Sequence, residues 1–146
     1  MTLTDSQLEF LQSTGSAAMI TVGPDGAAKA VRVGVGVVDG KLWSSGTHDR
    51  VRTARLRRDP RCTLFVFDAG FRWLTLETTV TILDGPDVPQ LSLRFFRQLQ
   101  GRPDGPLSWF SGELSEEEFV ATMAEERRLL YEFEVHRAYG LLAPPG

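Results

Sequence analysis

Cysteine is nearly absent: Cys62 is the single one among 146 residues. One cysteine cannot form an internal disulfide and has no partner at a metal-ligand spacing, which excludes a disulfide scaffold and a structural zinc site. Long apolar runs are absent too, because none approaches the ~18 residues of a membrane-spanning helix. Residues 1–12 also lack the basic and then apolar build of a signal peptide. We therefore expect a cytoplasmic protein that does not enter a membrane.

Histidine is scarce as well, with His48 and His136 as the two in the chain. No Ser-His-Asp arrangement can be assembled around them, and the G-x-S-x-G motif is missing. Three consecutive glutamates at 116–118 are typical of the acidic first turn of a helix. The sequence therefore offers no nucleophile or general base, and the catalytic residues stay unknown. Such a protein needs a cofactor that brings its own chemistry, as redox cofactors do.

The composition is otherwise that of one soluble globular domain. Hydrophobic residues make up 42% and charged residues 24% of the chain, which argues against a disordered or repetitive chain. A length of 146 residues gives room for one complete core, because domains commonly span about 100–200 residues. We predict a single domain over residues 1–146.

Positive charge is concentrated in one short segment of a chain whose net charge is −3. A local basic segment in an acidic protein suits a small phosphorylated ligand better than a polynucleotide, which needs a broad basic face. We therefore expect no nucleic-acid partner; a small barrel that binds nucleic acid through arginines and stacking aromatics is the competing hypothesis. Six arginines fall between positions 50 and 61: Arg50, Arg52, Arg55, Arg57, Arg58 and Arg61.

The hydrophobic pattern predicts an α+β fold that is mainly antiparallel β structure. Alternating apolar residues and tight turns predict strands at 16–22, 31–37 and 41–44, which we expect to form a meander. With two later strands they predict a small barrel. The elements expected are, in order, an N-terminal helix in 1–15, barrel strands with a short basic helix in 16–83, helical segments in 87–128, a last strand in 129–140 and a frayed tail at 143–146.

The junction between the third strand and the basic helix is the strongest candidate site. Backbone N–H groups at a helix start, hydroxyls just before them and guanidinium groups are three devices by which proteins hold phosphate. A helix cap beside a solvated basic face is the simpler interpretation of the same residues. The residues at this junction are Ser44, Ser45, Thr47, Arg50 and Arg52.

Two further segments could either contact a ligand or pack against another part of the protein. Arg32, Gly34 and Gly36 share one face of a strand, and missing side chains there admit either a flat ligand or a neighbouring element. Phe71 and Trp73 form an aromatic wall, either at a ligand or dimer surface or in the core.

Four motifs occur in order along the chain: AMITV at 18–22, PDG at 24–26, RVR at 50–52 with LRRDPR at 56–61, and RWLTLE at 72–77. Together they resemble the pyridoxamine 5′-phosphate oxidase-like split β-barrel family, in particular its flavin/deazaflavin branch that uses coenzyme F420. RRLL at 127–130 and AYGL at 138–141 extend the resemblance over nearly the whole chain. LRRDPR is the most specific of these motifs.

The resemblance implies a homodimeric FMN-binding split barrel with the cofactor in a groove between two protomers. Arg50 and Arg52 match the phosphate-binding basic positions, with Arg52 replacing the usual lysine, next to the strand end that carries Ser44, Ser45 and Thr47. Arg32 stands where the family often has proline; it would pair with an anionic tail or a carboxylated substrate, or block part of the groove. The remaining implied cofactor contacts are Val33 and Gly34 beside the ring and Phe71 and Trp73 where the partner protomer closes over it.

The function implied by the resemblance is hydride transfer between reduced coenzyme F420 and a small conjugated acceptor. Two hypotheses within the same fold stay open: an FMN-dependent oxidoreductase, and a protein that binds the cofactor without turnover. The physiological acceptor and the source of the proton stay unknown.

Overall fold

The first helix begins and ends at the residues that the sequence predicts. The computed structural model describes residues 1–143, and helix α1 spans Asp5–Thr14. The Gln7 N–H donates to Thr4 Oγ1 at 3.2 Å, and the Thr4 N–H donates to Gln7 Oε1 at 2.9 Å, which completes the capping box. Gly15 ends the helix at φ 63°, a left-handed conformation that suits glycine. Most of the predicted frayed tail, residues 144–146, lies outside the described residues.

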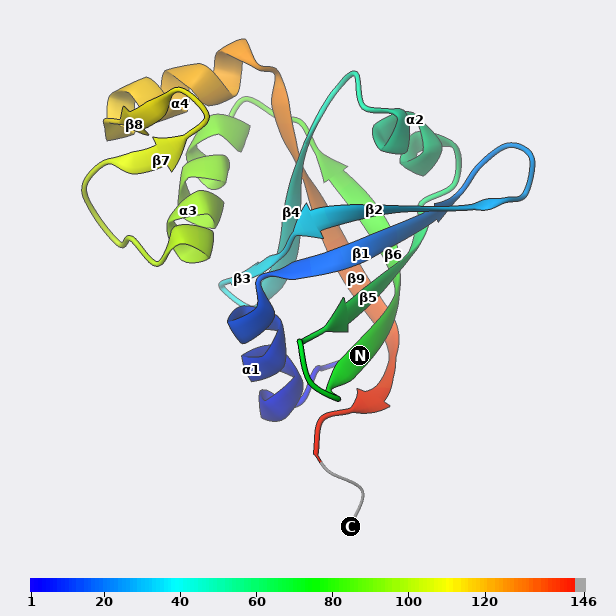
Figure 1. Cartoon of the computed structure of the whole chain (residues 1–146). Helices are drawn as coiled ribbons and strands as arrows, with labels where there is room; N and C mark the ends of the chain where they lie inside the picture. The colour runs from blue at the N-terminus through cyan, green and yellow to red at the C-terminus, as the bar shows by residue number, and fades with distance from the viewer. Residues whose placement is uncertain (144–146) are drawn as a thin grey trace.

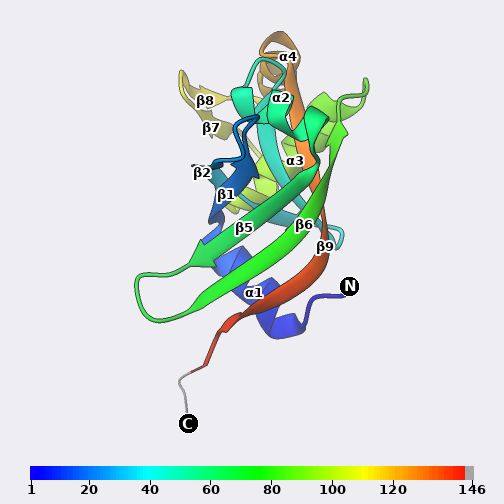
Figure 2. The same ribbon diagram turned by 90° about the vertical axis from the view of Figure 1, so that its right-hand side faces the viewer.

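Seven strands form one curled antiparallel sheet, which Figure 1 shows as the body of the molecule. Their order across the sheet is β2-β1-β5-β6-β9-β4-β3. The β6–β9 pair is the longest ladder and runs down one side of Figure 2. The strands are β1 (Ser16–Val22), β2 (Ala28–Gly34), β3 (Gly36–Val38), β4 (Lys41–Thr47), β5 (Arg61–Phe67), β6 (Trp73–Leu83) and β9 (Arg128–Leu141).

The predicted meander is wrong, because the chain leaves the sheet at Val35 and splits the expected second strand in two. β2 pairs with β1, and β3 pairs with β4, so no ladder joins β2 to β4 in the described chain. The Val35 N–H donates to the carbonyl oxygen of Gly15 at 3.0 Å, and its side chain is fully buried. The Ser44 hydroxyl bridges the split by donating to the Gly34 carbonyl at 2.6 Å. The α+β split barrel is therefore confirmed, with its opening between β2 and β4.

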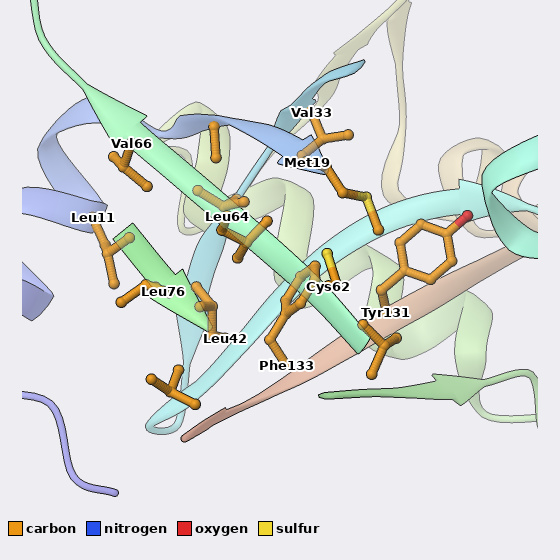
Figure 3. Close-up of a cluster of buried hydrophobic side chains, with 14 of the residues drawn as sticks. Leu11, Met19, Val33, Leu42, Cys62, Leu64, Val66, Leu76, Tyr131 and Phe133 are labelled. Carbon is orange, nitrogen blue, oxygen red and sulfur yellow. The ribbon is translucent and has the colours of Figure 1, made fainter. Parts of the chain in front are cut away.

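The inward faces of the strands form the core, as alternation predicts. Met19, Leu64 and Leu76 are fully buried in it, and Figure 3 shows them with Val33 and Cys62 around the same interior. Cys62 is 4% exposed and packs as a small hydrophobic residue. Burial of apolar surface at about 25 cal/mol per Å² makes this interior the main source of stability.

Three helices complete the fold, as predicted, together with one hairpin that the sequence does not predict. Helix α2 (Val51–Arg58) lies at one end of the barrel, while α3 (Val88–Gln100) and α4 (Glu116–Glu125) lie on its side in Figure 1. Phe95 of α3 packs against Trp43 and Leu130 on the outer face of the sheet. Between α3 and α4 the hairpin pairs β7 (Leu107–Trp109) with β8 (Gly112–Leu114). Within residues 1–143 no helix is long and apolar enough to cross a membrane.

We predict that Cys62 is chemically inert in the folded protein. Burial raises the pKa of the Cys62 thiol to about 12, and the thiolate is the reactive form. A thiol reagent such as dithionitrobenzoate at pH 8 should therefore label less than a tenth of the native protein while it labels the urea-unfolded protein at once. Rapid stoichiometric labelling of the native protein would contradict the burial of this side chain.

Candidate functional site

Arg52 lies at the open edge of the barrel. The ladder between β3 and β4 ends at Trp43, so the last four residues of β4 have a strand partner on the β9 side only. Arg52, in the first turn of α2, donates from Nη2 to the Ser45 carbonyl at 3.4 Å on this edge. Arg52 Nε and Ser45 Oγ are both buried, and neither has a hydrogen-bond partner within the described chain. Buried polar atoms are rarely left unpaired in proteins, so these two indicate a place for a ligand.

Tyr131 of β9 forms the floor of the site. Its ring lies beneath Arg52, with 5.8 Å between the guanidinium carbon and the ring centroid. The Thr53 hydroxyl donates to the Thr47 carbonyl at 2.8 Å, so the Tyr131 hydroxyl donates to Thr53 Oγ1 at 2.5 Å. A Cβ atom at Gly46 would collide with the Tyr131 ring, which explains why glycine occupies this position. The buried network thereby fixes the start of α2 against the barrel.

Other arginines surround Arg52. Burial lowers the pKa of the Arg52 guanidinium, and the nearby charges of Arg50 and Arg128 also lower it, although an arginine stays protonated in proteins. Arg127, in the turn before β9, is close enough to Asp49 for its charge to lower the pKa of that carboxyl, as the charge of Arg50 also does. Among residues 1–143, Arg50, Arg52 and Arg127 have no carboxylate within 4.0 Å. The end of the barrel therefore offers unpaired positive charge to an anion.

Arg127 and Arg128 are candidate site residues that sequence reasoning missed. The register that pairs Thr47 with Arg128 brings the start of β9 to the end of β4. Arg128 is held by Glu126 at 2.9 Å and lies over the Trp109 ring, whereas Arg127 adopts φ 53°, which is uncommon outside glycine. A pair of arginines directly before a strand was the available signal, but the sequence could not show which strand β9 pairs with.

The other hydroxyls predicted for the site are already engaged. The Ser44 hydroxyl bridges to Gly34, as described, and the Thr47 hydroxyl donates to Asp49 Oδ1 at 2.5 Å. This second hydrogen bond lowers the pKa of the Asp49 carboxyl. Arg50 is exposed just before α2 and makes no side-chain cap within the described chain. Of the five predicted residues, Ser45 and Arg52 therefore meet most directly.

Val33 and Gly34, at the end of β2 that the Ser44 hydroxyl contacts, have packing roles. Val33 is 6% exposed and points into the barrel core, as Figure 3 shows. A Cβ atom at Gly34 would lie 3.1 Å from Leu99, and one at Gly36 would lie 3.3 Å from Phe95. The structure thus favours the packing interpretation of these glycines, because helix α3 covers their face.

Arg32, Phe71 and Trp73 occupy the outer face of the sheet. Arg32 lines a groove there, apart from Arg52. Phe71 is 50% exposed, and Trp73 stacks edge-on against Tyr139 with 6.3 Å between ring centroids. Trp73 also lies 6.0 Å from Phe65. This aromatic surface, made by Phe65, Trp73 and Tyr139, runs across the neighbouring strands β5, β6 and β9, and Phe71 lies exposed in the adjoining β5–β6 loop.

A family model described as pyridoxamine 5′-phosphate oxidase matches residues 3–121. The chain belongs to the pyridoxamine 5′-phosphate oxidase family. This is a family of oxidoreductases whose members bind flavins or deazaflavins. A comparison with curated proteins finds no significant match.

Solved structures of this family's fold superpose on most of the chain. An F420 reductase is 17% identical over 90% of this chain and 94% of that one, with a TM-score of 0.63. A conserved protein of Mycobacterium tuberculosis is 19% identical over 96% and 85%, with a TM-score of 0.72. HutZ, a heme storage protein from Vibrio cholerae, is 13% identical over 95% and 94%, with a TM-score of 0.65. At these identities the likeness establishes the split-barrel fold.

We predict that Thr53→Val weakens anion binding more than the same substitution of a buried threonine in the barrel wall. The substitution leaves the Tyr131 hydroxyl and the Thr47 carbonyl without their shared partner beneath Arg52. Loss of a buried hydrogen bond should cost about 1–2 kcal/mol of stability, and inorganic phosphate, titrated by NMR, should bind several-fold more weakly.

Thr78→Val is the matched control for this substitution. Thr78 is also buried, and its hydroxyl donates to the Cys62 carbonyl at 2.7 Å, within the barrel wall. Its removal should lower the melting temperature by a similar amount and leave phosphate affinity unchanged. Equal losses of phosphate affinity in both variants would mean that the network does not act on Arg52 specifically.

Proposed function

We propose that the protein is an F420-dependent oxidoreductase that transfers a hydride between the reduced deazaflavin and a small conjugated acceptor. The observation that carries this proposal is the buried, unpartnered pair of Arg52 Nε and Ser45 Oγ at the open edge of β4. Unpaired arginine charge around it fits the anionic part of such a cofactor, and the family supplies redox chemistry that the chain's own side chains lack.

The residues present fit a bound phosphate group. Arg52 would donate to it from Nε while its Nη2 stays on the Ser45 carbonyl, and Ser45 Oγ would donate the proton that has no acceptor now. Arg50 and Arg127 would add charge from either side of Asp49. The start of α2 adds the partial positive charge of a helix N-terminus.

When bound, the reduced deazaflavin supplies a hydride, so that the acceptor gains two electrons and one hydrogen from it and a proton from solvent. The protein's own task is positioning, which explains how this chemistry proceeds without a catalytic triad. Acceptor carbon and hydride donor must lie about 3–3.5 Å apart for such a transfer.

The F420 assignment over FMN is supported by the sequence resemblance to the deazaflavin branch and by the number of unpaired arginines at the opening. FMN ends in one phosphate monoester, whereas three unpaired guanidinium groups from α2 and the α4–β9 turn suit a longer anionic chain. Equilibrium titration with both cofactors, followed by fluorescence, separates the two. Tight binding of FMN with no binding of F420 would replace the proposal by the FMN-dependent alternative.

We predict that Arg52→Ala weakens F420 binding by about 1.5–3 kcal/mol, the range for a hydrogen bond to a charged group. The melting temperature should change little, because the guanidinium has few internal partners to lose. Arg57→Ala is the control, since Arg57 lies on the same helix and pairs at 3.4 Å with Asp84 on the surface. Unchanged affinity in Arg52→Ala would remove this residue from the site.

We also predict that the protein is a dimer held together through the aromatic surface. Tyr139 is 42% exposed there, and Phe71, in the adjoining β5–β6 loop, is 50% exposed; exposed apolar surface of this kind is commonly covered by a partner. Light scattering at micromolar concentration should give twice the chain mass. Phe71→Ser should shift the population toward monomer, whereas Phe110→Ser, at the 91% exposed tip of the β7–β8 hairpin, should not. A monomeric wild-type protein would exclude this interface.

A further inference from the structure

A groove on the outer face of the sheet lies apart from the opening at Arg52. Its volume is about 490 Å³. Ala17 and Met19 of β1 are buried inside the barrel, so Ser16 and Ala18 point to the outer face. Ala18 pairs with Arg32 on one side and with Phe65 on the other. A row of small side chains between larger ones therefore makes a trough along β1.

The groove presents one available charge, and it is positive. Arg32 is exposed, and among residues 1–143 no carboxylate lies within 4.0 Å of it. Asp68, the carboxylate in the lining, is engaged by Arg72, whose Nε donates to Oδ2 at 2.7 Å. Asp68 Oδ1 accepts from the Gly70 N–H at 2.9 Å as well. Asp68 is therefore not available to neutralise Arg32 or to bind a cation.

The rest of the lining is apolar. Phe67 is 58% exposed at one wall of the groove. Ala18 and Ala30 form the base and carry no polar side-chain atom. A flat apolar body would contact these side chains over its whole face and would lose little hydration energy in doing so.

We propose that this groove binds a planar, apolar molecule through one carboxylate. Arg32 would hold the carboxylate by two parallel hydrogen bonds, the geometry for which guanidinium and carboxylate are matched, and the ring would lie over Ala18 against Phe67. The volume falls within the range of about 300–1,000 Å³ that is usual for small-molecule sites. This site is separate from the opening at Arg52, so it is a second ligand site beside the proposed cofactor site, and its ligand class is a planar carboxylate.

Arg32 differs from Arg52 in the anion that it suits. Arg52 has a helix start, a buried hydroxyl and neighbouring arginines around it, which together suit a phosphate. Arg32 lies in the middle of the edge strand β2, with Ala18 opposite it on β1 and Ala30 two residues earlier on the same face. A single guanidinium beside an apolar trough suits a carboxylate attached to a ring.

The test uses two probes with the same ring, 2-naphthoate and its neutral amide, 2-naphthamide. Titrations followed by NMR should show that wild-type protein binds naphthoate about tenfold or more tightly than naphthamide, with shifts in β1, β2 and the end of β5. Arg32→Gln should abolish the preference. Arg94→Gln, which removes the same charge from an ion pair with Asp39 on the far helix α3, should leave it unchanged.

A second variant tests the trough itself. Ala18→Leu fills the base of the groove and should weaken both probes equally, while a circular dichroism melt confirms that the barrel is folded. Failure of both probes to bind, equal affinity of the two for wild type, a preference that survives Arg32→Gln, or shifts confined to α2 would each overturn the proposal. If the wild-type protein prefers naphthoate over naphthamide but does not bind F420, the result contradicts the proposed cofactor and leaves the groove assignment standing.

Discussion

The edge of β4 that no strand of residues 1–143 covers is the constraint on which the site depends. A strand edge presents unpaired N–H and C=O groups, which proteins normally cover or charge. Here the break at Val35 separates β2 from β4, and the chain covers the gap with side chains. The Ser44 hydroxyl spans part of the gap by donating to the Gly34 carbonyl. One residue further along β4, the Ser45 carbonyl accepts a hydrogen bond from the Arg52 guanidinium. The opening that remains is lined by groups that prefer an anion.

The polar groups beneath Arg52 are hydrogen-bonded to one another, whereas two polar atoms of the site itself have no partner within the described chain. Tyr131 and Thr53 satisfy each other and the Thr47 carbonyl, so the buried polar groups beneath α2 are paired. Arg52 Nε and Ser45 Oγ, in contrast, are buried and have no hydrogen-bond partner within the described chain. Burying part of a guanidinium without an anion is unfavourable, and the surrounding structure maintains that arrangement. An anion bound there would supply the hydrogen-bond acceptors that these two atoms lack.

Features set by neighbouring residues are those that the sequence predicts well. The N-terminal helix, the acidic first turn of α4, the short basic helix and the proximity of Ser45 to Arg52 all follow from local spacing. Features set by distant pairing are not visible in the sequence. Alternating valines gave no sign that the strand divides at Val35, and nothing local shows that β9 lies beside β4. For the same reason Arg127 was missed, and the glycine face was open to two interpretations until α3 was seen to cover it.

Successive side chains of the long last strand, β9, alternate between the barrel interior and the outer face that α3 covers. Leu130 is buried outside the barrel against Phe95, and Tyr131, one residue later, is buried inside it. A deletion of one residue in the turn before β9 would exchange these two faces, because side chains alternate along a strand. It would place Tyr131 at the position of Leu130 under α3 and Glu132 at the position of Tyr131 under Arg52. Homologous chains should therefore tolerate changes of length around the β7–β8 hairpin and keep the spacing from the end of α4 to Tyr131 constant.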